Sequence, residues 1–485
     1  MSFFESKAAF VSILIVFFVC AFWSPFFSFS REGIIDALIG TPKYWFDEGF
    51  VVEAARGLVS LGRLDIAVEP GVLSGKPYFA SSPGFPVAVP LAGIFVLFGD
   101  GVLQIRTLAF VWLLAALTGI YLLWRRMFGP HAAFWGALLL ATFAPFYANG
   151  KTITGEIPGF LFLILALYSI YYKKWYVWGG VFAALALATK PSIYLLIAPA
   201  LILEFVIFER PFWRHALRVA IGTAPVLLLW LFIMFQNPFS SADWRGALRI
   251  YTNHYPLPSL LSQLPGTGVS FFGQSTILYT LVLAALFASA LLWKRLMFTE
   301  HEQRVFWFIA FYGIIDVIYF LLSPGWLRYL LPSQLFLLLA LYPALHALGS
   351  HPRRIAPGPV ILLLVLLQGV VFLWFSDIKS GLDAPHLAAY INQRLGENTN
   401  ATVGIINAVQ VSSLIPAEKK FLVVNCGGGC RFGTHPLSVA PERLPTYLIV
   451  GKSDRVGLSA FTDVVREYYR EVPEEQFGAL IYTRQ

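Results

Sequence analysis

Residues 81–101 read SSPGFPVAVPLAGIFVLFGDG, and this stretch decides on which side of a membrane every later loop of the chain lies. It is apolar but short, and Pro83, Pro86 and Pro90 all fall in its first half. Proline removes a backbone donor and clashes inside a helix. The stretch is therefore either a weak transmembrane helix or a helix that lies at the membrane surface. The rest of the sequence supplies the evidence that decides between the two.

The composition indicates a polytopic α-helical membrane protein. Of the 485 residues, 58% are hydrophobic and only 13% are charged, against about 25% charged residues in a soluble domain. Apolar runs of about 20 residues recur, and this length matches the bilayer core. The net charge of +8 would suggest nucleic acid in a soluble protein. Here we expect Lys and Arg to anchor cytoplasmic loops, with the lipid bilayer as a partner and no nucleic acid.

The distribution of basic residues settles the position of 81–101. If residues 83–99 do not span, the first loop, 30–101, is external and every later basic cluster lies in the cytoplasm. If they do span, every one of these clusters lies outside, which contradicts the positive-inside rule. We therefore expect an interfacial or re-entrant helix at 83–99 and about eleven spans, with the N-terminus inside and the C-terminus outside. The expected spans are 8–29, 102–124, 131–150, 157–172, 175–190, 192–208, 216–235, 274–293, 304–323, 328–348 and 357–376.

The chain changes character after the last span. Residues 1–376 are predicted to form the membrane domain, and residues 377–485 a small extracytoplasmic α/β domain with short apolar strands. Cys426 and Cys430, in CGGGC, either form a local disulfide or remain two unpaired thiols. The expected location is the cytoplasmic (inner) membrane, with the C-terminal domain facing the periplasm or exterior.

Several charged residues lie at the external membrane face, where topology does not explain them. Asp47 and Glu48, in YWFDEG, open an amphipathic stretch that fits a surface helix. A carboxylate there could be a general base or could simply complement a helix dipole. Glu156, in TGEIP, opens a span; it could bind a divalent metal or orient a substrate, or only complement its helix.

The basic residues at this face have two interpretations as well. Lys76, in SGKPY, could hold a lipid phosphate or anchor the chain at the interface. Lys190, in LATKPS, and Arg328, in LRYLLP, lie at outer span ends, where a phosphate is a plausible partner for arginine. Tyr329 is either part of that group or a membrane-belt residue.

Taken in order, these pieces resemble the polytopic glycosyltransferases of the C-type fold, which use polyprenyl-phosphate sugars. The likeness is to bacterial relatives of the protein O-mannosyltransferases and of the lipid A aminoarabinose transferases. It covers about residues 1–380, from YWFDEG through GKPYFASSPGFP and TGEIP to LATKPS and LRYLLP. Tyr78 stands where the family's Lys-Pro-Pro segment has its second proline, and Glu156 stands where relatives often carry Asp.

The resemblance implies a role for each matching residue. Asp47 would activate the acceptor hydroxyl, with Glu48 supporting it or holding the acceptor, and Glu156 would be a second acidic site, linked to a divalent metal. The donor phosphate would be held by Lys76, Lys190, Arg328 and Tyr329.

The implied activity is transfer of a single sugar from a polyprenyl-phosphate donor to a hydroxyl of a glycan, lipid or protein, with inversion at the anomeric carbon. The alternatives are an oligosaccharide transferase or lipid-linked glycan polymerase of similar fold, and a polytopic transporter or lipid flippase. The modest length of loop 236–273 favours single sugars, and the concentration of charge at one face argues against a transporter.

Overall fold

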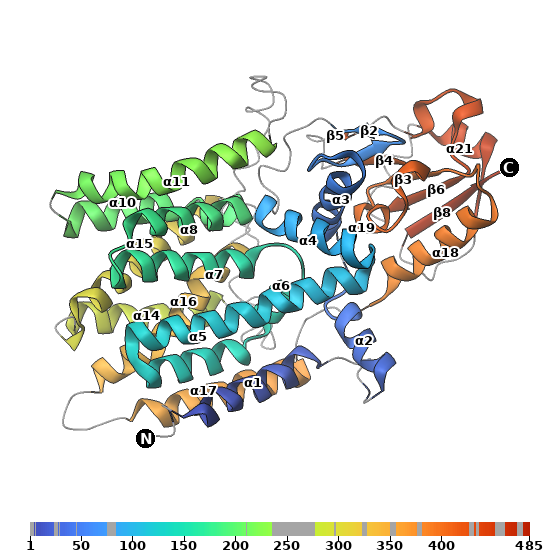
Figure 1. Cartoon of the computed structure of the whole chain (residues 1–485). Helices are drawn as coiled ribbons and strands as arrows, with labels where there is room; N and C mark the ends of the chain where they lie inside the picture. Colours follow the sequence, from blue (N-terminus) through green and yellow to red (C-terminus); the bar gives the residue numbers. More distant parts are fainter. Residues whose placement is uncertain are drawn as a thin grey trace.

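The computed structural model shows a bundle of long helices and a smaller α/β unit, with short helices between them (Figure 1). It describes residues 4, 6–23, 28, 30–44, 46–74, 84–209, 211–234, 277–294, 297–322, 327–349, 356–375, 381–425, 431–432, 436–451, 461–472 and 479–485. The predictions for Lys76, for loop 236–273 and for the cysteine pair Cys426 and Cys430 lie outside these residues.

The bundle is built from the apolar segments of the sequence. Its elements are α1 (Lys7–Ala21), α5 (Val102–Ala141), α6 (Ala144–Gly150), α7 (Glu156–Leu167), the π-helix η3 (Tyr168–Tyr172), α8 (Tyr176–Thr189), α9 (Pro191–Tyr194), α10 (Ile197–Phe208), α11 (Phe212–Met234), α14 (Ile277–Trp293), α15 (Glu300–Leu322), the 3-10 turn η6 (Leu327–Leu330), α16 (Leu331–Leu348) and α17 (Pro357–Phe375). Gly129, with a φ of 86°, and Pro130 kink the 40-residue α5. The sequence had predicted two spans there, at 102–124 and 131–150.

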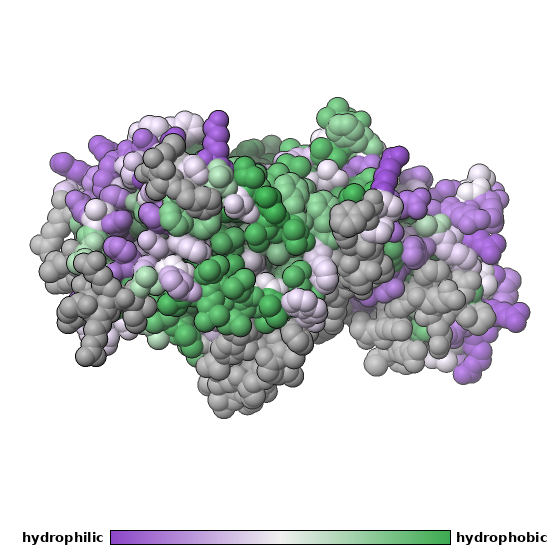
Figure 2. Space-filling model, turned by 90° about the horizontal axis from the view of Figure 1, so that it is seen from below, coloured by the Kyte–Doolittle hydropathy of each residue, from purple (hydrophilic) through white to green (hydrophobic). Residues whose placement is uncertain are grey.

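The bundle has the surface of a membrane protein. Among the described residues, six helices are long and apolar enough to cross a bilayer, and five apolar helices are shorter. Figure 2 shows a hydrophobic surface along the helical part, between a hydrophilic end on the left and the hydrophilic C-terminal unit on the right. A multi-pass helical membrane fold is thus present, while the total of eleven spans and the orientation stay predictions.

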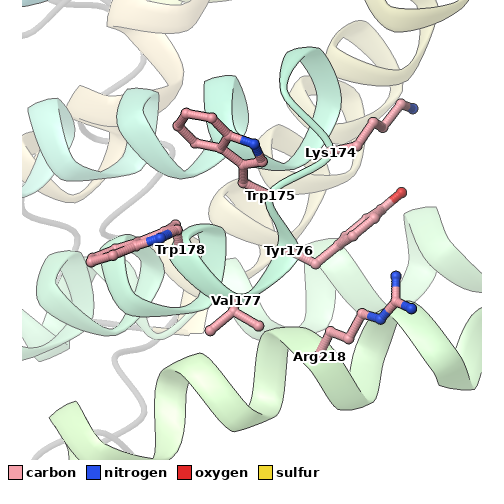
Figure 3. Close-up of a pocket in the computed structure, with 6 residues that line it drawn as sticks. All are labelled: Lys174, Trp175, Tyr176, Val177, Trp178 and Arg218. Carbon is pink, nitrogen blue, oxygen red and sulfur yellow. The ribbon is translucent and has the colours of Figure 1, made fainter.

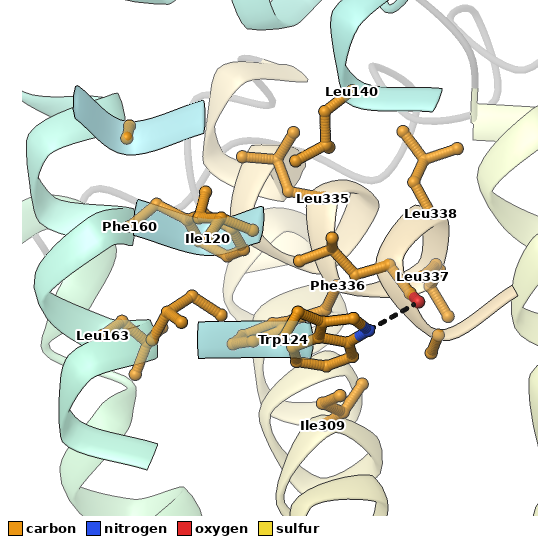
Figure 4. Packing of buried hydrophobic residues seen from close by; sticks show 14 of the residues in the cluster. Ile120, Trp124, Leu140, Phe160, Leu163, Ile309, Leu335, Phe336, Leu337 and Leu338 are labelled. Atoms are coloured by element: carbon orange, nitrogen blue, oxygen red, sulfur yellow. Dashed lines mark hydrogen bonds between the residues drawn. The ribbon is translucent and has the colours of Figure 1, made fainter. Parts of the chain in front are cut away.

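The centre of the bundle is a dry aromatic and aliphatic core. Trp124 of α5 is fully buried and packs among residues of α7, α15 and α16 (Figure 4). Its indole Nε1 donates a hydrogen bond of 3.2 Å to the carbonyl oxygen of Leu339, which satisfies the one polar atom that the ring brings into the core. This packing holds the bundle helices, and therefore their ends, in fixed positions.

The segment that decides the topology forms α4 (Phe85–Phe98). A 14-residue helix is about 21 Å long, shorter than the hydrocarbon core of about 30 Å. Its first turn is docked on the bundle, because the Gly84 N–H donates to the Thr189 carbonyl over 3.1 Å. A Cβ on Gly84 would lie 2.0 Å from the Ala188 oxygen. Length alone does not separate α4 from the expected spans, because α8 also has 14 residues, so the interpretation that α4 does not span stays a prediction.

The remaining elements cover the end of the bundle nearest α4. The first loop holds α2 (Arg31–Gly40), α3 (Phe46–Leu61) and a small hairpin, β1 (Ala67–Glu69) and β2 (Val72–Leu73). The C-terminal unit contains α18 (Asp383–Glu397), β3 (Val403–Ile406), α19 (Val409–Ser412), η7 (Ala417–Lys419), β4 (Lys420–Asn425), β5 (Arg431–Phe432), η8 (Pro436–Ser438), η9 (Pro441–Arg443), β6 (Tyr447–Gly451), α21 (Thr462–Tyr468), β7 (Tyr469–Glu471) and β8 (Ala479–Arg484).

The C-terminal unit is a mixed six-stranded sheet in the order β5-β4-β3-β6-β8-β7. The central strand β3 runs parallel to β4 and β6, and the remaining pairings are antiparallel. The apolar segments expected to be strands form β3, β4, β6 and β8. One buried cluster contains Val51 and Val52 of α3 together with Val409 of α19 and Ile449 of β6. The first loop and the sheet therefore share a single hydrophobic core.

Candidate functional site

Four of the charged residues singled out in the sequence come together at the end of the bundle beneath α3. Asp47 lies in the first turn of α3, and Glu156 opens α7. Lys190 lies at the junction of α8 and α9, and Arg328 lies in η6. The cluster contains two carboxylates and two cations drawn from segments far apart in the chain, so it is neutral as a group when all four are ionised.

Asp47 and Arg328 form the first ion pair of this cluster. Arg328 Nη1 donates to Asp47 Oδ2, and the two side chains are 14% and 24% exposed, respectively. Burial acts to raise the pKa of Asp47, but the positive charges of Arg328 and Lys190 outweigh it and hold that pKa below its usual value. Asp47 is therefore ionised and reachable from outside the bundle, as a proton acceptor must be.

Glu156 and Lys190 form the second ion pair, and it is more deeply buried. Lys190 Nζ lies 3.6 Å from Glu156 Oε1, and the side chains are 5% and 0% exposed. Neither carboxylate oxygen of Glu156 has a hydrogen-bond partner among the described residues. Buried carboxylate oxygens are normally hydrogen-bonded, so this group is available to a ligand.

The backbone around the second pair is fixed by local structure. Gly155 precedes Glu156 with a φ of 89°, a conformation that glycine adopts without a Cβ clash. Pro191 breaks the path from α8 to α9 directly after Lys190, as proline disfavours helix in the residue before it. The Tyr194 hydroxyl of α9 donates to the Glu156 carbonyl. The two charged residues are thus held against each other by α7 and α9.

Glu48 does not join Asp47, contrary to the interpretation from the sequence. Consecutive residues of a helix point to different sides, and Glu48 turns inward to Arg106 of α5, whose Nη2 lies 2.9 Å from Glu48 Oε2. Neither side chain is exposed, and the Ile153 N–H donates to the second Glu48 oxygen over 3.3 Å. Arg106 also donates to the carbonyls of Pro42 and Lys151. In this structure Glu48 fixes the start of α3 on the bundle.

Tyr329 lies beside Arg328 and is buried, with its ring centroid 5.6 Å from that of Tyr319 on α15. It supports η6 from the bundle side. The predicted roles of Tyr329 in holding a phosphate and of Lys76 in the same task stay predictions.

A further buried ion pair, also not predicted from the sequence, joins α3 to the C-terminal unit. Lys420 Nζ of β4 donates to Glu53 Oε1 of α3, and Ser412 Oγ donates to the same oxygen over 2.6 Å. Both charged side chains are at most 1% exposed. The Tyr44 and Ser413 hydroxyls are hydrogen-bonded over 2.8 Å. The helix that carries Asp47 is thus fixed from two sides, by the bundle and by the C-terminal unit.

Among the described residues, Glu156 is the predicted metal ligand whose surroundings can be compared with those of a cation site. Glu156 has two buried oxygen atoms without hydrogen bonds, as a cation ligand would, but its nearest charged neighbour is the Lys190 ammonium. In the described part of the chain, no group of three or more His, Cys, Asp or Glu residues is arranged to hold a metal ion. The protein groups seen here would supply at most part of a coordination shell.

Comparison with known proteins agrees with this arrangement. Residues 84–237 match the family model of the dolichyl-phosphate-mannose-protein mannosyltransferases. No curated protein matches the sequence. Among solved structures, ArnT from Cupriavidus metallidurans bound to undecaprenyl phosphate is similar, with 13% identity, a TM-score of 0.56, and coverage of 98% of this chain and 97% of that chain.

A second similar structure is the archaeal oligosaccharyltransferase AglB from Archaeoglobus fulgidus in complex with an inhibitory peptide and a dolichol-phosphate. Its identity is 12% and its TM-score 0.57, with coverage of 100% of this chain and 75% of that chain. The same archaeal enzyme has also been solved in complex with Zn and sulfate, with a TM-score of 0.55. The fold of this chain is therefore that of the C-type membrane glycosyltransferases, as the sequence resemblance predicted.

Proposed function

We propose that the chain is a membrane glycosyltransferase that moves a sugar from a polyprenyl-phosphate donor to an acceptor hydroxyl. The observation that carries this proposal is the neutral cluster of Asp47, Glu156, Lys190 and Arg328 at one end of an apolar bundle. In such a cluster, the two cations can hold a leaving phosphate while the ionised carboxylate next to them accepts a proton. The fold and the family match over residues 84–237 support the same class of reaction.

The proposed chemistry is a single displacement. The acceptor oxygen forms a bond to the anomeric carbon while the bond from that carbon to the phosphate oxygen breaks, which inverts the carbon. Asp47 takes the proton of the acceptor hydroxyl. Lys190 and Arg328 stabilise the negative charge that appears on the departing lipid phosphate. Arg328 suits this task because its guanidinium can bind two phosphate oxygens at once.

Glu156 has two proposed tasks. Its charge favours the protonated form of Lys190, against the effect of burial, and holds the ammonium in position for the phosphate. Its unbonded oxygens also suit a divalent cation, which would add positive charge near the phosphate; Mg²⁺ is commonly bound by one or two carboxylates plus substrate phosphates. No step of the proposed displacement requires that ion.

The orientation belongs to the proposal as well. With the basic clusters in the cytoplasm, the Asp47 cluster and the C-terminal unit face the periplasm or exterior of the cytoplasmic membrane. A lipid-linked donor presents its sugar at that interface. Accordingly, the enzyme does not require a nucleotide-binding motif.

The test is transfer of labelled sugar from synthetic polyprenyl-phosphate donors by purified protein in lipid nanodiscs. We expect Asp47→Asn and Glu156→Gln to reduce transfer at least a hundredfold, the lower range for loss of general base or charge stabilisation. The matched control is Glu69→Gln, which changes a carboxylate to an amide in the hairpin of the same loop and should leave transfer unchanged.

Two results would overturn the proposal. One is full activity in both cluster variants, and the other is no transfer by the wild-type protein with any single-sugar donor. Transfer from a lipid-linked oligosaccharide but not from single-sugar donors would favour the alternative oligosaccharide transferase.

A further inference from the structure

A pocket lies at the end of the bundle far from the Asp47 cluster. Helix α8 connects the two, because its last residues touch α4 and Lys190 while its first residues line this pocket. The cavity measures about 330 Å³ and lies between the start of α8 and the facing turn of α11. It is lined by Lys174, Trp175, Tyr176, Val177, Trp178 and Arg218.

The lining is divided into a cationic and an apolar part. In Figure 3 the polar ends of Lys174, Tyr176 and Arg218 point to one side, and the indole rings of Trp175 and Trp178 lie on the other. The two indoles are 57% and 58% exposed. A phospholipid has the same division, with an anionic phosphate next to an apolar body. Tryptophan rings favour the level of the headgroups in a bilayer.

The charge of the pocket is not cancelled by its own residues. Among the six lining residues are two cations and no carboxylate. The nearest acid is Glu209, which accepts a bond of 3.4 Å from the Tyr176 hydroxyl. Its carboxylate is already engaged by Arg304 and, over 3.4 Å, by His215. Lys174 also lies close enough to Glu209 to help lower the pKa of that carboxyl, so Glu209 offsets part of the positive charge that Lys174 and Arg218 bring to the lining.

The walls of the pocket are rigid. Helices α8 and α11 touch backbone to backbone, since a Cβ on Gly180 would lie 2.0 Å from the Val219 oxygen, and one on Gly222 would lie 1.9 Å from the Val177 oxygen. Lys174 adopts a φ of 58° directly before α8, a left-handed conformation that is uncommon for residues other than glycine and that often marks functional positions. The backbone positions from which Lys174 and Arg218 extend are thus fixed relative to each other.

We propose that this pocket binds the headgroup of an anionic phospholipid of the bilayer. Lys174 and Arg218 would contact the phosphate, and the acyl chains would follow the indoles onto the lipid-facing side of α8. Basic pockets between membrane helices commonly hold acidic headgroups. The site is separate from the proposed catalytic cluster, and its test does not depend on transferase activity.

The test is a titration of the detergent-purified full chain with phosphatidylglycerol or phosphatidylcholine, with bound lipid counted by native mass spectrometry. We expect selective binding of phosphatidylglycerol. The Lys174→Gln/Arg218→Gln variant should lose about thirtyfold in affinity, from about fivefold for each basic residue near a membrane surface. Trp178→Ala should weaken binding of the same lipid without altering its selectivity.

The control removes two positive charges that lie outside the pocket lining, in Arg214→Gln/Lys294→Gln, and should retain wild-type affinity. Three outcomes would overturn the proposal: equal losses in the two double variants, equal binding of the two lipids, or displacement of phosphatidylglycerol by inorganic phosphate at the same concentration. The first would indicate diffuse surface charge, and the last a site for free anions.

Discussion

Replacement of Lys420 by methionine should loosen the helix that carries Asp47, although Lys420 lies in the C-terminal unit. The side chains of Lys420 and Glu53 are 0% and 1% exposed. Removing one partner of a buried ion pair costs about 3–5 kcal/mol, because the other charge is left buried without compensation. In Lys420→Met that charge is the Glu53 carboxylate on α3, less than two helical turns after Asp47.

The magnitude can be read from amide hydrogen exchange of α3, which reports the free energy of local opening. A loss of about 3–5 kcal/mol corresponds to exchange faster by roughly two to three and a half orders of magnitude, at about 1.4 kcal/mol per factor of ten. Sugar transfer should fall through kcat more than through KM for the donor, because Asp47 is displaced while the cations of the bundle are not.

The neighbouring Lys419→Met provides the matched control, because Lys419 is partly exposed and its ammonium contacts only the Thr399 carbonyl among the hydrogen bonds described. It should leave exchange of α3 unchanged. The double variant Glu53→Gln/Lys420→Met should recover part of the protection, since it no longer buries a lone charge. Equal exchange of α3 in Lys420→Met and Lys419→Met would refute the reasoning.

Three further changes test other parts of the structure. Gly84→Ala should displace α4 and reduce transfer at least tenfold with the fold retained, since its Cβ would meet the Ala188 oxygen at 2.0 Å; activity and circular dichroism together check this. Arg106→Met should lower the free energy of unfolding by about 3–5 kcal/mol by removing the buried cation beside Glu48, and a normal thermal midpoint would contradict it. Burial, with Arg106 nearby, lowers the pKa of Lys151 to about 7, so the unfolded chain binds more protons above pH 7. Lys151 should therefore contribute about 1.4 kcal/mol of stability per pH unit between pH 7 and 10, and the thermal midpoint of Lys151→Met should rise less steeply with pH than that of the wild type.

The sequence was sufficient for features that depend on local composition or on the two sides of a membrane. The apolar run of 83–99 predicted a helix, and α4 (Phe85–Phe98) is that helix; that it does not span stays a prediction. The four residues of the cluster could be selected together, because each is a charged residue at the predicted external face that the positive-inside rule does not explain: Asp47, Glu156, Lys190 and Arg328. That reasoning needs no contact information, only the order of spans and the sign of each charge.

The pairings themselves could not be predicted. Glu48 and Arg106 are 58 residues apart, and Glu53 and Lys420 are 367 apart, so no helical or strand periodicity links them. Glu48 was grouped with Asp47 because the two are adjacent, but the helix turns them to different sides. The burial of Lys420 was not predicted, because it lies in a strand-like segment and lysine is rarely buried. A lysine at the first position of a largely apolar strand was the signal that the sequence offered.

The ion pairs of the cluster bear on how a donor would start the reaction. In the structure Arg328 is engaged by Asp47, which keeps the pKa of Asp47 low and makes it a weak base. A phosphate that binds Arg328 and Lys190 would neutralise the charges that lower this pKa, because a carboxylate loses its stabilisation when its cations are taken by another anion. The pKa of Asp47 would then rise toward the operating pH, where general-base catalysis is most efficient. On the proposed mechanism, binding of the donor phosphate to Arg328 and Lys190 therefore makes Asp47 a stronger base when the acceptor hydroxyl has to lose its proton.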